Sequence, residues 1–114
     1  MPLLTITSNQ KRDDALIGEL IEKASETVAA MLGKPERYVM VSFNHNPQMR
    51  FAGSAEPLAY LELKSIGLPA ERTAEFSQIL CDTVSQQLQI PADRIYIEFS
   101  DAQRHLWGWN GSTF

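Results

Sequence analysis

The segments "KPERYVMVSF" (Lys34–Phe43) and "IPADRIYIEF" (Ile90–Phe99) repeat one pattern, 56 residues apart, in a chain of 114 residues. In each, a proline is followed by three residues and then by apolar side chains at alternate positions. The matching residues are Pro35, Val39, Val41 and Phe43 in the first segment and Pro91, Ile95, Ile97 and Phe99 in the second. Such alternation after a turn predicts a strand, and its recurrence indicates two similar structural units.

The repeat extends upstream, so each half is predicted to fold as strand, helix and strand. In the first helix, apolar residues recur at helical spacing, Asp13 can cap the start, and Gly33 with Pro35 ends it. The first half is predicted as strand Leu3–Thr7, helix Asp13–Leu32 and strand Tyr38–Phe43. The second half is predicted as strand Leu58–Leu63, helix Pro69–Leu88 and strand Arg94–Ser100.

Two such βαβ units predict an α/β fold in which a four-stranded mixed sheet carries both helices on one face. We expect one domain over residues 1–114, with the repeat units at 2–57 and 58–114. The strands have apolar residues on both faces, so the face without helices is expected to be apolar and to form an oligomer interface. The aromatic tail "LWGWNGSTF" (Leu106–Phe114) is expected to dock on its own domain or on a neighbouring subunit.

Composition excludes several classes of function. The net charge of −4 and the absence of a basic run argue against a nucleic-acid partner. No apolar run is long enough to span a membrane, and the N-terminus lacks the pattern of a secretory signal. The single cysteine, Cys81, excludes an internal disulfide and fits a reducing compartment, so we expect a cytoplasmic protein. Neither zinc-ligand spacing nor a nucleotide-binding glycine motif is present.

Pro2 follows the first methionine directly. Methionine is commonly removed before small residues, and its removal would leave the Pro2 nitrogen as a free secondary amine. The alternative is an ordinary proline at the first position of a strand. Taken singly, other candidates also have structural explanations: Lys34 as a cation at a helix C-terminus, Tyr96 as an interface residue, and the aromatic tail as packing.

Five motifs in order carry a family resemblance: "MP" at residues 1–2, "GKP" at 33–35, "SIG" at 65–67, "DRIYIEF" at 93–99 and "GWNGSTF" at 108–114. Together they resemble the macrophage migration inhibitory factor family of the tautomerase superfamily, over the whole chain. The resemblance implies a homotrimer whose three sheets face inward as a barrel, with pockets between subunits. It also implies a keto–enol tautomerase that needs no cofactor and acts on phenylpyruvate-type α-keto acids and dopachrome-type compounds.

The resemblance assigns Pro2 as the catalytic base. The residues that it implies for substrate binding are Lys34, Ile66, Tyr96, Trp107, Trp109 and Phe114, with Leu3 and Tyr38 at the rim. A free α-amine titrates near pH 7.7–8.0, and apolar walls and a nearby lysine lower that pKa toward the range of a general base. Lys34, with the backbone N–H of Ile66, would hold the carboxylate and polarise the keto oxygen.

Three departures from the family pattern affect what can be transferred. Glu98 stands where asparagine is frequent, and near the pocket it would repel anionic substrates and raise the pKa of Pro2. Trp107 replaces a small aliphatic residue and could narrow the mouth. "LAYL" (Leu58–Leu61) lacks the family's two thiols, so thiol-redox activity is not transferred. An alternative hypothesis is a cytokine-like, partner-binding protein in which tautomerase activity is residual.

Overall fold

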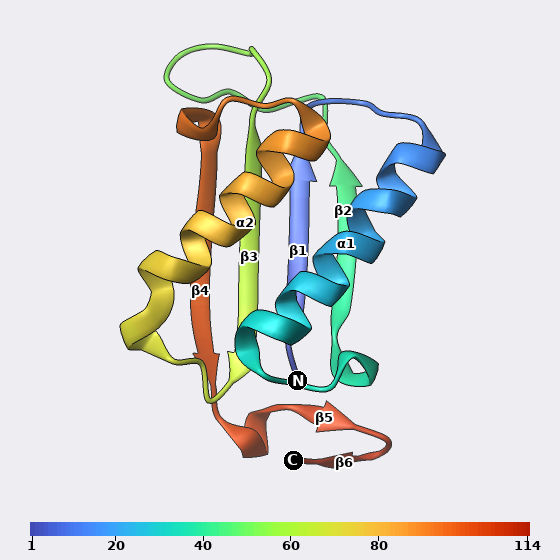
Figure 1. Ribbon diagram of the computed structural model, residues 1–114, viewed down its shortest axis with the longest axis vertical. Coiled ribbons are helices and arrows are strands. Elements are labelled where there is room, and N and C mark those ends of the chain that lie inside the picture. Colours follow the sequence, from blue (N-terminus) through green and yellow to red (C-terminus); the bar gives the residue numbers. More distant parts are fainter.

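The computed structural model describes residues 1–114, and its main elements alternate as the repeat predicts (Figure 1). The four-stranded sheet has the order β2–β1–β3–β4, with β1 parallel to β2, β3 parallel to β4, and β1 antiparallel to β3. The bounds are β1 Leu3–Ser8, α1 Asp14–Leu32, β2 Met40–His45, β3 Ala59–Ile66, α2 Thr73–Leu88 and β4 Ile95–Ala102. The predicted α/β fold with a mixed sheet is confirmed.

Helix ends follow the local chemistry of the sequence. The Asp13 side chain caps α1 by accepting a hydrogen bond from the backbone N–H of Leu16, at 2.8 Å. At the other end Gly33 adopts a left-handed conformation with φ of 64° and ends the helix as expected. The predicted second helix is divided, because Ala70–Arg72 form a short 3-10 helix before α2 begins at Thr73.

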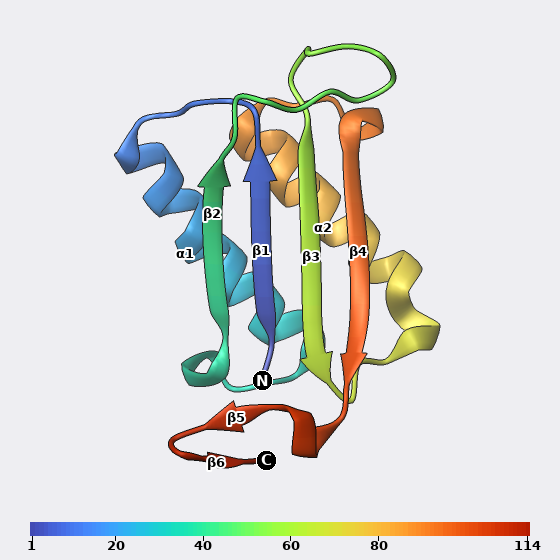
Figure 2. The ribbon, with the colours of Figure 1, turned by 180° about the vertical axis from the view of Figure 1, so that it is seen from behind.

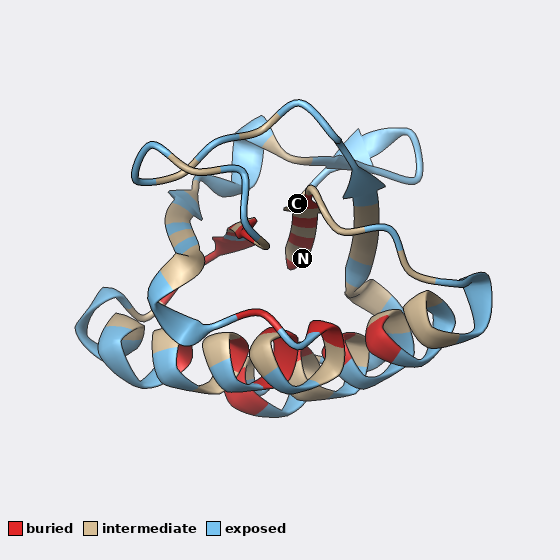
Figure 3. Ribbon diagram, turned by 90° about the horizontal axis from the view of Figure 1, so that it is seen from above, coloured by how far each residue is buried: buried red, intermediate tan, exposed pale blue.

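Both helices cover one face of the sheet (Figure 3). The core between the two layers is apolar, and its most deeply buried large residues include Leu4, Ile6, Leu20, Leu61, Leu63, Phe76, Leu80 and Leu88. Alternate residues of β1 and β3 point into this core, which gives the two strands their period-two burial pattern. No helix combines the length and the apolar character that crossing a membrane would require.

The prediction that the helix-free face is apolar is wrong. Strand alternation and register leave fourteen positions on this face: Leu3, Thr5, Thr7, Met40, Ser42, Asn44, Tyr60, Glu62, Lys64, Ile66, Tyr96, Glu98, Ser100 and Ala102. Most of these are polar, because Val39, Val41 and Phe43, which suggested the apolar face, pack against the helix side instead. The apolar members divide between opposite ends of the sheet, with Leu3, Met40, Ile66 and Ala102 at one end and Tyr60 and Tyr96 at the other.

The C-terminal tail forms a small hairpin that the sequence patterns did not predict. Strands β5 (Gly108–Trp109) and β6 (Ser112–Thr113) are joined by Asn110 and Gly111, both with positive φ. Asn-Gly with two positive φ angles is the preferred two-residue hairpin turn. The hairpin lies across the end of the sheet where the chain begins, so the two termini are close together (Figure 2).

Candidate active site

A cavity of about 380 Å³ lies where the start of β1 meets the C-terminal hairpin. Its walls are mainly apolar and aromatic, and they are formed by Met1, Pro2, Leu3, Arg37, Tyr38, Val39, Met40, Trp107, Gly108, Trp109 and Phe114. This volume is within the usual range for small-molecule sites. The structure therefore brings Pro2, Trp107, Trp109 and Phe114 together in one pocket, with the rim residues Leu3 and Tyr38.

Pro2 lines this cavity and is held in place. Its side chain is less than 2% exposed, and its carbonyl accepts a hydrogen bond from the N–H of Met40, at 3.0 Å. Met1 precedes it here, so the Pro2 nitrogen is an amide and the free amine belongs to Met1. Burial, followed by the charges of Lys34 and Arg104, lowers the pKa of that amine below its usual value. An amine at this position is thus held toward its neutral form.

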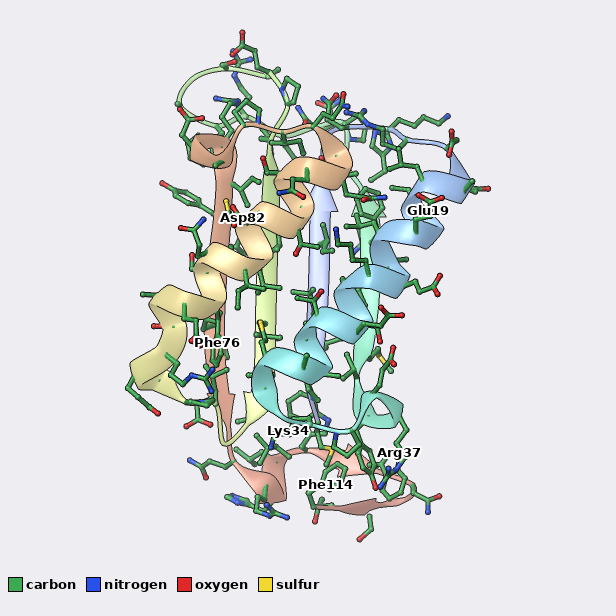
Figure 4. All side chains as sticks on the ribbon, viewed as in Figure 1. Glu19, Lys34, Arg37, Phe76, Asp82 and Phe114 are labelled. Carbon is green, nitrogen blue, oxygen red and sulfur yellow. The ribbon has the colours of Figure 1, made fainter.

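Lys34 lies beside the cavity and is not part of its wall. The left-handed turn at Gly33 ends α1 and places Lys34 at the same end of the sheet as Pro2. Its Nζ donates a hydrogen bond to the carbonyl oxygen of Ile66, at 3.2 Å (Figure 4 labels Lys34). The contact of Lys34 with Ile66 is therefore through the carbonyl, whereas the sequence suggested a role for the Ile66 N–H. Ile66 itself is buried at the end of β3.

Three aromatic rings form one side of the cavity. The Tyr38 ring meets Trp109 edge-on, with centroids 5.5 Å apart, and meets Phe114 edge-on at 6.2 Å. Trp109 and Phe114 stack at 5.6 Å. The N–H of Phe114 donates to the carbonyl of Trp107 at 3.2 Å, which holds the last residue in place. These contacts make the hairpin a fixed wall that can hold the ring of a substrate.

Tyr96 is not part of this cavity. It lies at the opposite end of the sheet, where it pairs in register with Tyr60 and contacts the Phe51 ring at 4.6 Å. There it lines a second cavity of about 520 Å³ and remains 66% exposed. Within one chain, the structure thus separates Tyr96 from the other predicted site residues. The reason is topological, because β4 starts at the end of the sheet where β1 finishes.

Glu98 also lies away from Pro2 in its own chain. Its Oε2 accepts a hydrogen bond from the Tyr60 hydroxyl at 2.9 Å, on the helix-free face of the sheet. That hydrogen bond is the largest contribution that raises the pKa of Tyr60, with burial and Glu62 adding to it. Any effect of Glu98 on the Pro2 site therefore has to come from another subunit.

Five residues of the cavity wall were not among the site residues predicted from the sequence: Met1, Arg37, Val39, Met40 and Gly108. Arg37 is carried by a 3-10 helix, Glu36–Tyr38, which starts after Pro35 and delays β2 to Met40. The sequence signal was present, because Arg37 directly precedes Tyr38 in the segment that follows Lys34. A short helix was needed in place of a strand to turn Arg37 to the cavity.

Comparison with known proteins gives a consistent result over the whole chain. The family model described as Macrophage migration inhibitory factor (MIF) matches residues 1–114. A macrophage migration inhibitory factor homolog of Brugia malayi is 38% identical over 115 residues and covers 100% of this chain and 99% of its own. The macrophage migration inhibitory factor of Xenopus tropicalis is 36% identical with the same coverage.

Solved structures agree with these relatives. The crystal structure of a macrophage migration inhibitory factor homologue from Prochlorococcus marinus matches with a TM-score of 0.92 and 46% identity, covering 98% of both chains. The structure of the macrophage migration inhibitory factor from Trichinella spiralis matches with a TM-score of 0.91 and 34% identity, covering 98% of this chain and 99% of the other.

Proposed function

Because this chain belongs to the macrophage migration inhibitory factor family, within the tautomerase superfamily, we propose that it is a cofactor-independent keto–enol tautomerase. Its substrates in this proposal are phenylpyruvate-type α-keto acids and dopachrome-type compounds. The observation that carries the proposal is the position of Pro2 in the wall of an aromatic cavity, where burial and two cations lower the pKa of the amine of the preceding Met1. The reaction requires removal of Met1, which exposes the Pro2 nitrogen to the cavity.

The proposed base acts through the neutral amine. The Pro2 nitrogen takes a proton from the carbon next to the keto group, and the C–H electron pair forms the carbon–carbon double bond. The keto oxygen then carries the negative charge, and it becomes the enol when the proton is delivered to it. Burial and the charges of Lys34 and Arg104 lower the pKa of the Met1 amine, and in the proposal they act in the same direction on a terminal Pro2 amine, which favours its neutral form.

Lys34 supplies the positive charge for this reaction. Its ammonium uses one donor on the Ile66 carbonyl and has two further donors for the substrate. In the proposal these bind the carboxylate and stabilise the developing enolate oxygen. The rings of Tyr38, Trp109 and Phe114 then hold the aromatic part of the substrate.

We also propose a homotrimer in which Tyr96 completes the site of a neighbouring subunit. Tyr96 and Met40 are among the few large apolar side chains that remain exposed, at 66% and 65%. They lie at opposite ends of the helix-free face, so contact between copies would cover both. Light scattering at micromolar concentration tests this assembly, and a clean monomer would contradict it.

The decisive test pairs an intact-mass measurement with a phenylpyruvate tautomerase assay. Protein that has lost Met1 is expected to be active, and protein that retains Met1 is expected to be inactive. Both samples should have the same circular dichroism spectrum, since the residue at issue is at the chain end. Equal activity in the two samples would rule out the Pro2 amine as base. Inactivity in both would favour a partner-binding role for the pocket.

A further inference from the structure

The arginines of this chain differ in whether their guanidinium groups have partners. Four of the six are hydrogen-bonded: Arg12 to Gln10 and two backbone carbonyls, Arg50 to the Gly53 carbonyl, Arg72 to Glu75, and Arg94 to four carbonyls. The guanidinium groups of Arg37 and Arg104 form neither a hydrogen bond nor a salt bridge. These two are also the arginines at the Pro2 cavity, Arg37 in its wall and Arg104 close enough to affect the terminal amine.

Arg37 is held by an aromatic contact that leaves its donors free. Its Cζ lies 4.7 Å from the centroid of the Tyr38 ring, the ring that also meets Trp109 and Phe114. Stacking on an aromatic face orients a guanidinium without using its N–H groups. The cavity wall contains no Asp or Glu that could neutralise it.

Lys34 and Arg37 lie apart at this end of the molecule, with Phe114 below and between them (Figure 4). Lys34 is tied to Ile66 on β3, whereas Arg37 is carried by the 3-10 helix that precedes β2. The site thus has Lys34 near Pro2 and Ile66, Arg104 close to the terminal amine, and unpaired Arg37 in the cavity wall beside the Tyr38 ring. A substrate with a single carboxylate needs only the first of these.

We propose that Arg37 binds a second acidic group, so that the preferred substrates are aromatic 2-keto acids with a carboxylate on the ring. This inference rests on the proposed tautomerase function. The keto-acid end lies at Lys34 and Pro2, the ring lies against Tyr38 and Phe114, and the second carboxylate receives two N–H donors of Arg37. Guanidinium suits this role because it binds a carboxylate through two parallel hydrogen bonds.

The test compares phenylpyruvate with 4-carboxyphenylpyruvate for wild type, Arg37→Gln and Lys23→Gln, all lacking Met1. Arg37→Gln is expected to lose about three- to tenfold in kcat/KM for the dicarboxylate and less than twofold for phenylpyruvate, because Arg37 is exposed. Arg37→Lys should recover part of the loss. Lys23→Gln, on the exposed side of α1 and outside both cavities, should change neither substrate. In wild type, the ratio of kcat/KM for 4-carboxyphenylpyruvate to that for phenylpyruvate should also fall as the salt concentration rises.

Binding measured by tryptophan fluorescence separates failure of this inference from failure of the proposed function. If wild type binds 4-carboxyphenylpyruvate more tightly than phenylpyruvate and Arg37→Gln loses that difference, the inference holds even without turnover. Equal losses on both ligands, or no loss on either, would make Arg37 an ordinary solvated cation and overturn it. Absence of phenylpyruvate turnover in wild type would overturn the tautomerase proposal alone.

Discussion

The two cavities of this molecule occupy equivalent places in the two repeat units, yet they differ in chemistry. The 56-residue shift that aligns the halves relates Pro2 to Leu58 and Met40 to Tyr96. The first member of each pair lines the cavity of about 380 Å³, and the second lines the cavity of about 520 Å³. The βαβ unit therefore forms a hollow wherever its parallel strands begin, and the residues placed there determine what the hollow can do.

Charged side chains and the position of the chain terminus account for the chemical difference between the two cavities. Lys34 of the first half corresponds to Ile90, which is buried in the core, and Tyr38 corresponds to Arg94, which is bonded to a loop. The first cavity therefore has unpaired cations, whereas the cation of the second is used in structure. Only the first cavity lies at the chain terminus, where an α-amine can exist. A repeat can duplicate a fold in this way while leaving catalysis to one copy.

Removing the amine is expected to have the largest effect, because it makes the first cavity resemble the second. Inserting alanine between Met1 and Pro2 keeps every side chain of the cavity but converts the Pro2 nitrogen into an amide. An amide nitrogen is not basic, so phenylpyruvate tautomerase activity should fall by ~10²–10⁴-fold. Pro2→Gly is the matched control, since it retains an α-amine after methionine removal and should stay partly active. Full activity of the insertion variant would contradict the mechanism.

Much of the fold could be predicted because it depends on local patterns. Alternating apolar residues after Pro35 and Pro91, with caps at Asp13 and Gly33, were sufficient to predict two strands and the ends of a helix. The helix-free face was predicted incorrectly because a run such as "YVMVSF" (Tyr38–Phe43) looks apolar throughout. The register with β1, which pairs Val41 with the buried Leu4 and Phe43 with the buried Ile6, decides which residues of β2 face the helices.

The candidate site was predicted less completely, because it is assembled from distant parts of the chain. Motif resemblance identified Pro2, Trp107 and Phe114, which the structure brings into one cavity. It could not indicate that Tyr96 lies at the other end of the sheet in the same chain, since that depends on strand order. Arg37 was missed because its role depends on a 3-10 helix and on the absence of any partner.

Replacing Arg94 is expected to have the next largest effect, which is on the free energy of unfolding. Its guanidinium donates to the carbonyls of Phe51, Ser54, Glu56 and Pro57 at 2.9–3.2 Å and so holds the loop around the second cavity. Arg94→Ala leaves these carbonyls without their donor and should lower the free energy of unfolding by about 2–3 kcal/mol.

The matched variant for Arg94→Ala is at the equivalent position of the first cavity. The Tyr38 hydroxyl forms no hydrogen bond, so Tyr38→Phe should change the free energy of unfolding by less than about 0.5 kcal/mol. Urea denaturation followed by circular dichroism measures both. Similar destabilisation by the two substitutions would show that the cavities do not differ in how their side chains are used.

Lys34→Ala should have an intermediate effect, specific to charged substrates. Losing one charge-assisted contact from a partly exposed lysine should reduce kcat/KM for phenylpyruvate by about tenfold, with a smaller loss on an uncharged dopachrome-type ester. Lys23→Ala, on the exposed side of α1, is the control and should not alter either rate. Equal losses on both substrates would mean that Lys34 does not bind the carboxylate.

The smallest expected effect is on the pH dependence of the first cavity. Burial and the charges of Lys34 and Arg104 lower the pKa of the terminal amine, so the rate should rise with pH through a midpoint below ~7.7–8.0. Arg104→Gln removes a positive charge that opposes protonation, so the amine pKa and the midpoint should move upward by a few tenths of a unit.

Glu98→Asn should move the midpoint downward if the neighbouring subunit brings Glu98 to the amine, because a carboxylate favours the ammonium form. Lys23→Gln, on the exposed side of α1 and outside both cavities, should leave the midpoint unchanged. Phenylpyruvate kcat/KM measured from pH 5 to 9 gives all four midpoints, and 0.5 M salt should reduce the Arg104 shift by screening. A downward shift for Arg104→Gln would contradict the assignment of the titrating group as an amine among cations.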